Sequence, residues 1–260
     1  MSASDLLFTL PLGAALGFFG GLFGIGGGVI AIPLLGLAFG MDQALAQGTA
    51  LVMMVPNLVI GWWRYQQRHP VPWRRVAALA TVATATTAVT AHFAARLDPA
   101  VLRALFGVFM SALALSLMWR AGAAADTPRP GRRERLIPLV GLIGGSSMGL
   151  LGVGGGLLAA PLFVRLFRQR QTVAQSLALA LVTPSAAVAL ATYAQAQRVD
   201  WAMGLPMAIG GLLTVSAGVA LAHRLPEARM RTLFAFLLLA TGLWRSEEHT
   251  SELQSHSGIS

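Results

Sequence analysis

The sequence alternates between long apolar runs and short polar segments. The first run, Leu6–Gly40, extends over 35 uncharged residues. A helix needs about 20 apolar residues to cross a bilayer, so runs of this kind are typical of membrane elements. The pattern predicts an all-α, polytopic transmembrane protein with about eight membrane segments. These are Leu6–Gly40, Gln43–Trp63, Val76–Ala95, Ala104–Trp119, Leu136–Val164, Gln171–Gln197, Trp201–Ala222 and Thr232–Trp244.

The composition agrees with a membrane protein and excludes most soluble classes. Hydrophobic residues make up 55% of the chain, charged residues only 11%, and the mean hydropathy is +0.67. A soluble domain carries about 25% charged residues. The net charge of +9 reflects an excess of arginines, 19 in all, which cluster between the apolar runs. This distribution is typical of topology signals rather than of a nucleic-acid interface. We therefore expect the lipid bilayer, and no nucleic acid, as a partner.

The two halves of the chain resemble copies of each other. A single shift that places Gln47 on Gln175, here called the repeat offset, aligns positions 12–112 with the second half without a gap. Chance can match glycines in apolar runs, but it does not readily match several rarer residue types at one offset. We predict a first membrane repeat over residues 6–119, a basic cytoplasmic linker over 120–135 and a second membrane repeat over 136–245. Internal repeats of this kind are typical of transporters. The matched pairs include Gln47 and Gln175, Pro56 and Pro184, Tyr65 and Tyr193, Trp73 and Trp201, and Arg96 and Arg224.

The arginine distribution favours repeats of opposite orientation. If the first element of each repeat enters and leaves the membrane on one face, each repeat has three crossings and the copies are inverted. In that arrangement 15 arginines lie inside and 4 outside, against 11 and 8 if all eight elements span. The first partition follows the positive-inside rule better. In addition, the run Leu136–Val164 has only 29 residues, which is too short for two full spans.

A glycine-rich motif occurs once in each copy and predicts a break in the first element. Each glycine disfavours a helix by about 1 kcal/mol relative to alanine. A broken helix exposes backbone N–H groups that can bind an anion. The alternative is close packing through small residues, to which we assign the upstream glycines Gly13, Gly17 and Gly21. The motif residues are Gly24, Gly26, Gly27 and Gly28, followed by Pro33, and Gly152, Gly154, Gly155 and Gly156, followed by Pro161.

Polar side chains in the next element of each copy complete the candidate substrate-binding site. A glutamine amide can donate a hydrogen bond to an oxyanion without carrying a charge. Hydrogen bonding between helices is the open alternative. No carboxylate lies in the middle of an apolar run, so a buried carboxylate proton relay is not supported. The candidates are Gln47, Thr49 and Asn57 in the first copy and Gln175, Ser176 and Ser185 in the second.

The sequence does not support an enzyme. The segment Gly145–Gly149 has the spacing of a nucleophile elbow, but no strand pattern precedes it and no acid or histidine partner can be assigned. The chain has no cysteine and no metal-ligand spacing, so we expect neither a metal site nor a cofactor.

The duplicated glycine motif, the glutamine early in the next element and its mid-helix proline together resemble the TauE/SafE sulfite exporter family of bacterial permeases. The resemblance extends from about Leu6 to Trp244. It implies a transporter in the bacterial inner membrane for sulfite, sulfonates or related sulfur-containing anions. It also implies that the substrate region includes Gly24, Gly26–Gly28 and Gln47, with their copies Gly152, Gly154–Gly156 and Gln175.

We predict from these features a multi-pass permease that moves a small anion by alternating access at the interface between the repeats. The alternative is a membrane scaffold or assembly subunit without transport activity. A monomer and a homo-oligomer are both compatible with the sequence. Residues 246–260 are expected to be a non-native tail, because they hold three of the ten acidic residues and resemble translated sequencing-adapter DNA.

Overall fold

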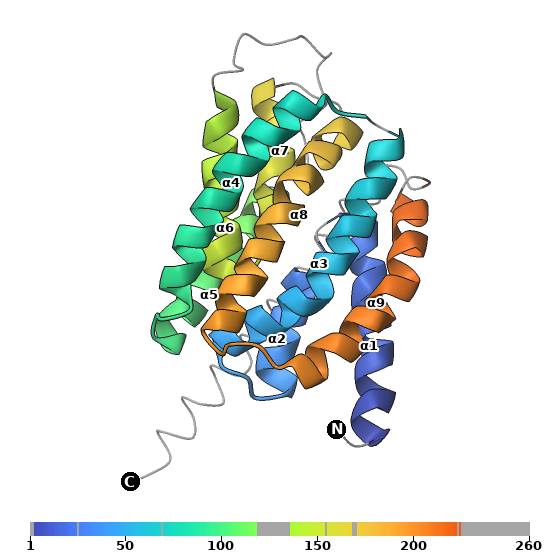
Figure 1. Ribbon diagram of the computed structural model, residues 1–260, viewed down its shortest axis with the longest axis vertical. Helices are drawn as coiled ribbons and strands as arrows, with labels where there is room; N and C mark the ends of the chain where they lie inside the picture. Colours follow the sequence, from blue (N-terminus) through green and yellow to red (C-terminus); the bar gives the residue numbers. More distant parts are fainter. Residues whose placement is uncertain are drawn as a thin grey trace. The chain divides into compact units, whose positions relative to one another are not determined.

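The computed structural model describes residues 3–24, 26–68, 70–118, 136–153, 155–167, 171–222 and 224. Within these residues the fold consists of nine helices and contains no strand (Figure 1). The all-α prediction is therefore confirmed for this part of the chain. The helices are α1 (Ala3–Phe23), α2 (Gly28–Ala38), α3 (Gln43–Arg68), α4 (Trp73–Ala94), α5 (Pro99–Met118), α6 (Ile137–Leu151), α7 (Gly155–Phe167), α8 (Gln171–Gln195) and α9 (Trp201–Ala222).

Four of these helices are long and apolar enough to cross a bilayer. They are α3, residues Val76–Ala94 of α4, residues Val173–Gln195 of α8, and α9. The helices α2, α6 and α7 are shorter, because the first and fifth apolar runs are each interrupted at their glycine motif. The predicted eighth run at 232–244, the linker at 120–135 and the tail at 246–260 lie outside the described residues.

The chain divides into two compact units. Residues 1–102 and 126–224 form the first unit, which includes α1–α4 and α6–α9. Residues 103–125 and 225–260 form the second unit, which takes in most of α5. The contacts among α1–α4 and α6–α9 lie within the first unit.

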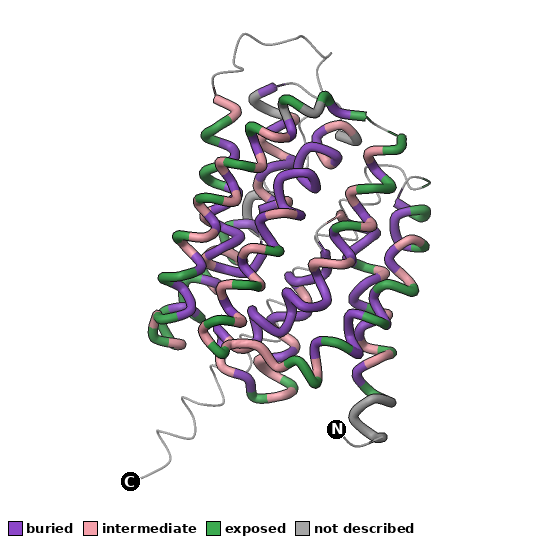
Figure 2. The backbone as a smooth tube through the Cα atoms, viewed as in Figure 1, coloured by how far each residue is buried: buried purple, intermediate pink, exposed green. Residues whose placement is uncertain are grey.

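The helices α3 and α8 form the centre of the first unit and run in opposite directions (Figure 1). The hydroxyl of Tyr65, near the end of α3, reaches Gln175 near the start of α8, whereas Gln47 near the start of α3 meets Tyr193 near the end of α8. Buried residues are concentrated in the first half of each helix (Figure 2). Most of each apolar stretch is enclosed by protein, 72% in α3 and 67% in α8, so both helices are central rather than lipid-facing.

The first apolar run folds back on itself. The helix α1 ends at Phe23 and α2 begins at Gly28 after the break. The ring centroids of Phe8, in the first half of α1, and Phe39, just beyond α2, lie 5.9 Å apart. Because the two ends of the run are neighbours, α1 and α2 form a hairpin rather than one continuous span.

The helix α1 packs on α9, and α6 packs on α4, through glycines that let the backbones approach closely. An added Cβ on Gly17 would overlap the backbone of Gly211, and one on Gly145 would overlap the backbone of Ala83. Small residues serve the same purpose in other helix pairs within membranes. The packing role predicted for the upstream glycines is confirmed. The full set of contacts is Gly13–Met207, Gly17–Gly211 and Gly21–Val215 for α1 on α9, and Gly141–Leu79, Gly145–Ala83 and Gly149–Thr87 for α6 on α4.

Candidate functional site

The two glycine motifs form the breaks that the sequence predicts. In the first break, Gly24, Gly26 and Gly27 have φ angles of +67°, +72° and +87°. In the second, Gly152 ends α6 with a φ of +66°. Side chains disfavour this left-handed region, so glycine is the residue that makes each break possible. The motif residue Gly154 lies outside the described residues.

The two breaks lie against each other, although they are far apart in the sequence. A Cβ built on Gly28, the first residue of α2, would lie 2.7 Å from the Cγ1 atom of Val153. A Cβ on Gly156, near the start of α7, would lie 3.6 Å from the carbonyl oxygen of Gly24. The starts of α2 and α7 therefore meet at one place. In α2 the N–H of Ile30 already donates to the carbonyl of Gly27 at 3.2 Å, which leaves the N–H groups of Gly28 and Val29 without an acceptor in the helix.

Each break is accompanied by a glutamine from the opposite half of the chain. A Cβ built on Gly152 would lie 3.2 Å from the Cβ of Gln47, which belongs to α3. A Cβ built on Gly24 would lie 3.8 Å from the Nε2 atom of Gln175, which belongs to α8. The structure thus brings the predicted glutamines to the predicted breaks, crosswise.

A buried tyrosine holds each glutamine. The hydroxyl of Tyr193 donates to Oε1 of Gln47 at 2.6 Å, and the hydroxyl of Tyr65 donates to Oε1 of Gln175 at 3.0 Å. Gln47 is fully buried, yet its Nε2 group has no hydrogen-bond partner among the described residues. Because the tyrosine binds the amide oxygen, the amide N–H groups of the glutamine are left as donors.

The sequence interpretation missed both tyrosines as site residues. They are the only tyrosines in the chain, and the repeat offset that matches the two glutamines matches them as well. That coincidence is a signal in the sequence, but it is not enough to show which side chain each tyrosine contacts.

The remaining predicted side chains have other contacts. Thr49 accepts a hydrogen bond from the backbone N–H of Asp200 at 3.0 Å. The hydroxyl of Ser185 donates to the carbonyl of Leu181 within α8 at 2.9 Å. The first bond joins α3 to the start of α9 and the second lies within one helix, so neither bond directs its side chain at the breaks.

Ser176 and Asn57 differ from each other in their hydrogen bonding. The hydroxyl of Ser176 donates to Oε1 of Gln66 at 3.4 Å. Asn57 lies against Gly211 of α9, where a Cβ on that glycine would approach the Asn57 Nδ2 atom to 2.6 Å. The oxygen and nitrogen of the Asn57 amide are both buried without a hydrogen-bond partner among the described residues. The contact with Gly211 does not explain why this position holds a polar side chain.

The described residues of the site carry no fixed charge. The segments Gln43–Trp63 and Gln171–Gln197, which supply both glutamines, contain no acidic or basic residue. In the described part of the first unit, Arg198 and Asp42 form an ion pair at 3.1 Å, and both side chains are about one-third exposed. That pair connects the loop before α9 to the start of α3. Neutral donors, namely backbone N–H groups and glutamine amides, are therefore what the site can offer a ligand.

Comparisons with known proteins agree over nearly the whole chain. The sequence model of the family described as sulfite exporter TauE/SafE matches residues 9–245. A probable membrane transporter protein of Xylella fastidiosa (strain Temecula1) is 27% identical over 95% of this chain and 98% of its own length.

Two further relatives carry the same description. One from Methanocaldococcus jannaschii is 26% identical over 92% of this chain and 96% of its own length, and one from Bacillus subtilis is 26% identical over 94% and 99%. No solved structure matches the chain. Because the family match covers far more than half of the sequence, and the helices are long and apolar enough for a bilayer, the chain is an integral membrane protein that belongs to the sulfite exporter TauE/SafE family of membrane transporters.

Proposed function

We propose that the protein is a permease that carries a small sulfur-containing anion, such as sulfite or an organosulfonate, across the bacterial inner membrane. The anion binds between the two glycine breaks and is moved by alternating access. Backbone N–H groups at the starts of α2 and α7, with the amides of Gln47 and Gln175, stabilise its negative charge.

The observation that carries this proposal is the unpartnered amide of Gln47. A buried donor without a partner costs about 1–3 kcal/mol, so a folded protein rarely keeps one without a reason. The Gln47 side chain lies against Gly152 through its Cβ and Cγ atoms, in the short turn between the end of α6 and the start of α7 at Gly155. Helix starts favour anions because their N–H groups point outwards and the helix dipole is positive there. A bound oxyanion would satisfy both the amide and the helix start.

The absence of a charged residue in the two central segments also suits transport. A fixed arginine beside the anion would bind it strongly, whereas conduction requires binding that is weak enough for release. Neutral donors provide such binding. Sulfite and sulfonates present several oxygen acceptors in a small volume, which fits a site made of several separate donors.

An inverted repeat is part of the proposal. The helices α3 and α8 are equivalent under the repeat offset, and they are antiparallel neighbours. The hairpin of α1 and α2 supports the same arrangement, because it returns the first element to the face it entered. The packing of α1 on α9 and of α6 on α4 follows the same offset. Inverted repeats place substrate at their interface near the middle of the membrane.

Transport into liposomes tests the proposal. Purified protein is reconstituted, and uptake of sulfite, sulfate, organosulfonates and thiosulfate is measured under a pH gradient and under a membrane potential. We expect flux of sulfite or a sulfonate, and we expect Gln47→Ala to reduce it at least tenfold, since a hydrogen bond to a charged group contributes about 1.5–3 kcal/mol.

The matched control is Gln195→Ala, an exposed glutamine near the end of α8, which should transport at the wild-type rate. Gly27→Ala is a less suitable variant, because its Cβ would lie 2.6 Å from the carbonyl oxygen of Leu16 and would disturb folding. No flux of any of these anions by folded wild-type protein would favour the alternative of a scaffold or assembly subunit.

A further inference from the structure

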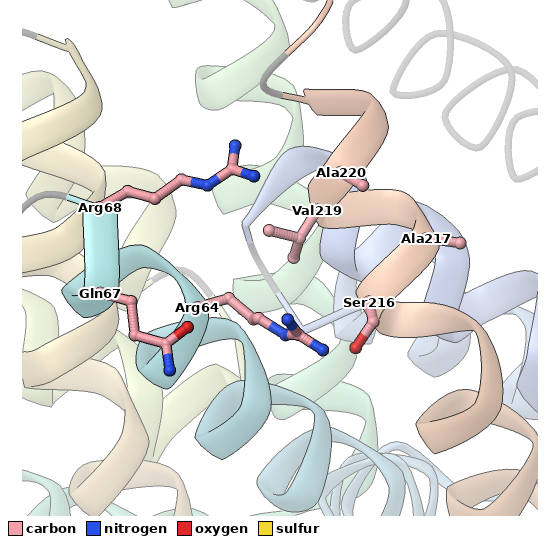
Figure 3. Close-up of a pocket in the computed structure, with 7 residues that line it drawn as sticks. All are labelled: Arg64, Gln67, Arg68, Ser216, Ala217, Val219 and Ala220. Carbon is pink, nitrogen blue, oxygen red and sulfur yellow. The ribbon is translucent and has the colours of Figure 1, made fainter.

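A second feature of the first unit is a basic pocket that shares no residue with the glycine breaks. A pocket of about 390 Å³ lies between the last turns of α3 and of α9. The side chains of Arg64 and Arg68 extend from α3 across this pocket towards Ser216 and Val219 of α9 (Figure 3). The remaining lining residues are Gln67, Ala217 and Ala220.

The two arginines are not neutralised by the described protein. The lining contains no acidic side chain, and within the described residues neither guanidinium group has a carboxylate within ion-pair distance. Both side chains are exposed, and they are four residues apart on one helix, which places them on the same face. Two guanidinium groups one turn apart favour an acidic ligand with several oxygen acceptors.

The repeat offset shows that the arginines are not a requirement of the fold. The corresponding positions in the second half are Thr192 for Arg64 and Ala196 for Arg68, and Ala88 corresponds to Ser216. The same helix ends are thus built without arginine elsewhere in the chain. The basic pocket belongs to one end of one helix pair.

The surface beside the pocket is apolar and exposed. Trp63 precedes Arg64 and is 62% exposed, and Leu213 lies one turn before Ala217 on α9 and is 72% exposed. A tryptophan next to arginines at the end of a spanning helix is typical of the membrane–water interface. A ligand with an acidic head and an apolar body would place its head at the arginines and its body along α3 and α9.

The geometry points to a binding site for the phosphate group of an anionic phospholipid in this pocket. The phosphate accepts hydrogen bonds from Arg64 and Arg68, and Ser216 supplies a hydroxyl donor. Basic pockets between transmembrane helices bind acidic headgroups in this way. This site does not depend on the proposed transport function, since it shares no residue with the glycine breaks.

Native mass spectrometry of the detergent-purified protein tests the site, with phosphatidylglycerol and phosphatidylcholine added at equal concentration. We expect selective retention of phosphatidylglycerol by the wild type. In the double variant Arg64→Gln/Arg68→Gln its affinity should fall at least about tenfold, because charge-assisted hydrogen bonds are lost. Arg96→Gln is the matched control, because Arg96 is exposed and lies just beyond α4, and it should retain the lipid.

Three outcomes would overturn the proposal. They are equal retention of the two lipids, an equal loss of phosphatidylglycerol in Arg96→Gln, and displacement of bound lipid by millimolar inorganic phosphate, which would assign the pocket to a free anion. Both positions are exposed, so the double variant should fold. A unimodal elution profile on size exclusion checks this. Gln47→Ala separates the two proposals, because it should bind phosphatidylglycerol like the wild type even where transport fails.

Discussion

Gln47 is held at one end of its amide and unpartnered at the other. The Tyr193 hydroxyl donates to the amide oxygen at 2.6 Å, while Nε2 is buried without a partner among the described residues. A glutamine that was free to rotate would lose side-chain entropy on binding a ligand. In the proposed site Tyr193 is therefore a positioning residue, since it would remove that cost before an anion binds.

Removal of one hydroxyl tests this role. Tyr193→Phe should raise the anion concentration at half-maximal transport about 2- to 10-fold, because one hydrogen bond contributes about 0.5–1.5 kcal/mol. The maximal rate should change less. Initial rates of uptake across a range of substrate concentrations separate the two quantities.

Tyr65→Phe is the matched variant in the other half and should have a smaller effect. Its hydrogen bond to Gln175 is longer, at 3.0 Å, and Gln175 is only half-buried. A Tyr193→Phe protein with an unchanged half-saturation concentration would contradict the positioning role, whatever its stability.

Helix pairs show what the sequence could and could not predict. The breaks were predictable, because four glycines in five residues disfavour a continuous helix wherever they occur. The small faces of α1 and α6 were predictable as packing surfaces. The partners were not, because a glycine stripe shows that a backbone comes close without identifying it. In the structure α1 packs on α9, which begins only at Trp201, in the other half of the chain. The tyrosine–glutamine contacts also join the two halves, and they were hidden for the same reason.

Overpacking at the contact of α1 with α9 should destabilise the protein. Gly17→Ala puts a methyl group against the backbone of Gly211, and such insertions cost about 1–3 kcal/mol. We expect a lower midpoint of thermal unfolding in detergent. The matched control is Gly36→Ala in α2, where an added Cβ would meet only the carbonyl oxygen of Met41 at 3.7 Å. Gly36→Ala should unfold at or above the wild-type temperature, because it removes a helical glycine. Equal midpoints for Gly17→Ala and the wild type would show that the two helices separate at little cost.

The two halves of the site differ in exposure. Gln47 and Gly152 are buried, whereas Gln175 and Gly24 are half-buried. Because these residues correspond in pairs at the repeat offset, one arrangement occurs in two versions, one sealed and one partly open. Under the proposed alternating access, an exchange of the two versions between the halves would bury Gln175 and expose Gln47. Such an exchange is what alternating access requires of an inverted repeat.

The proposed exchange between the halves requires that they have opposite orientations in the membrane, which cysteine labelling can measure directly. The chain contains no cysteine, so a single introduced thiol is the only target. Gln67 and Gln195 are the same position in the two halves, and both are exposed glutamines near the ends of the antiparallel helices α3 and α8. A membrane-impermeant maleimide should label Gln67→Cys in inside-out vesicles and Gln195→Cys in intact spheroplasts. Gln67 is expected on the cytoplasmic side because arginines cluster around residues 64–75.

If both variants were labelled only in inside-out vesicles, or both only in spheroplasts, the halves would be parallel. An exchange of conformations between inverted halves would then be excluded.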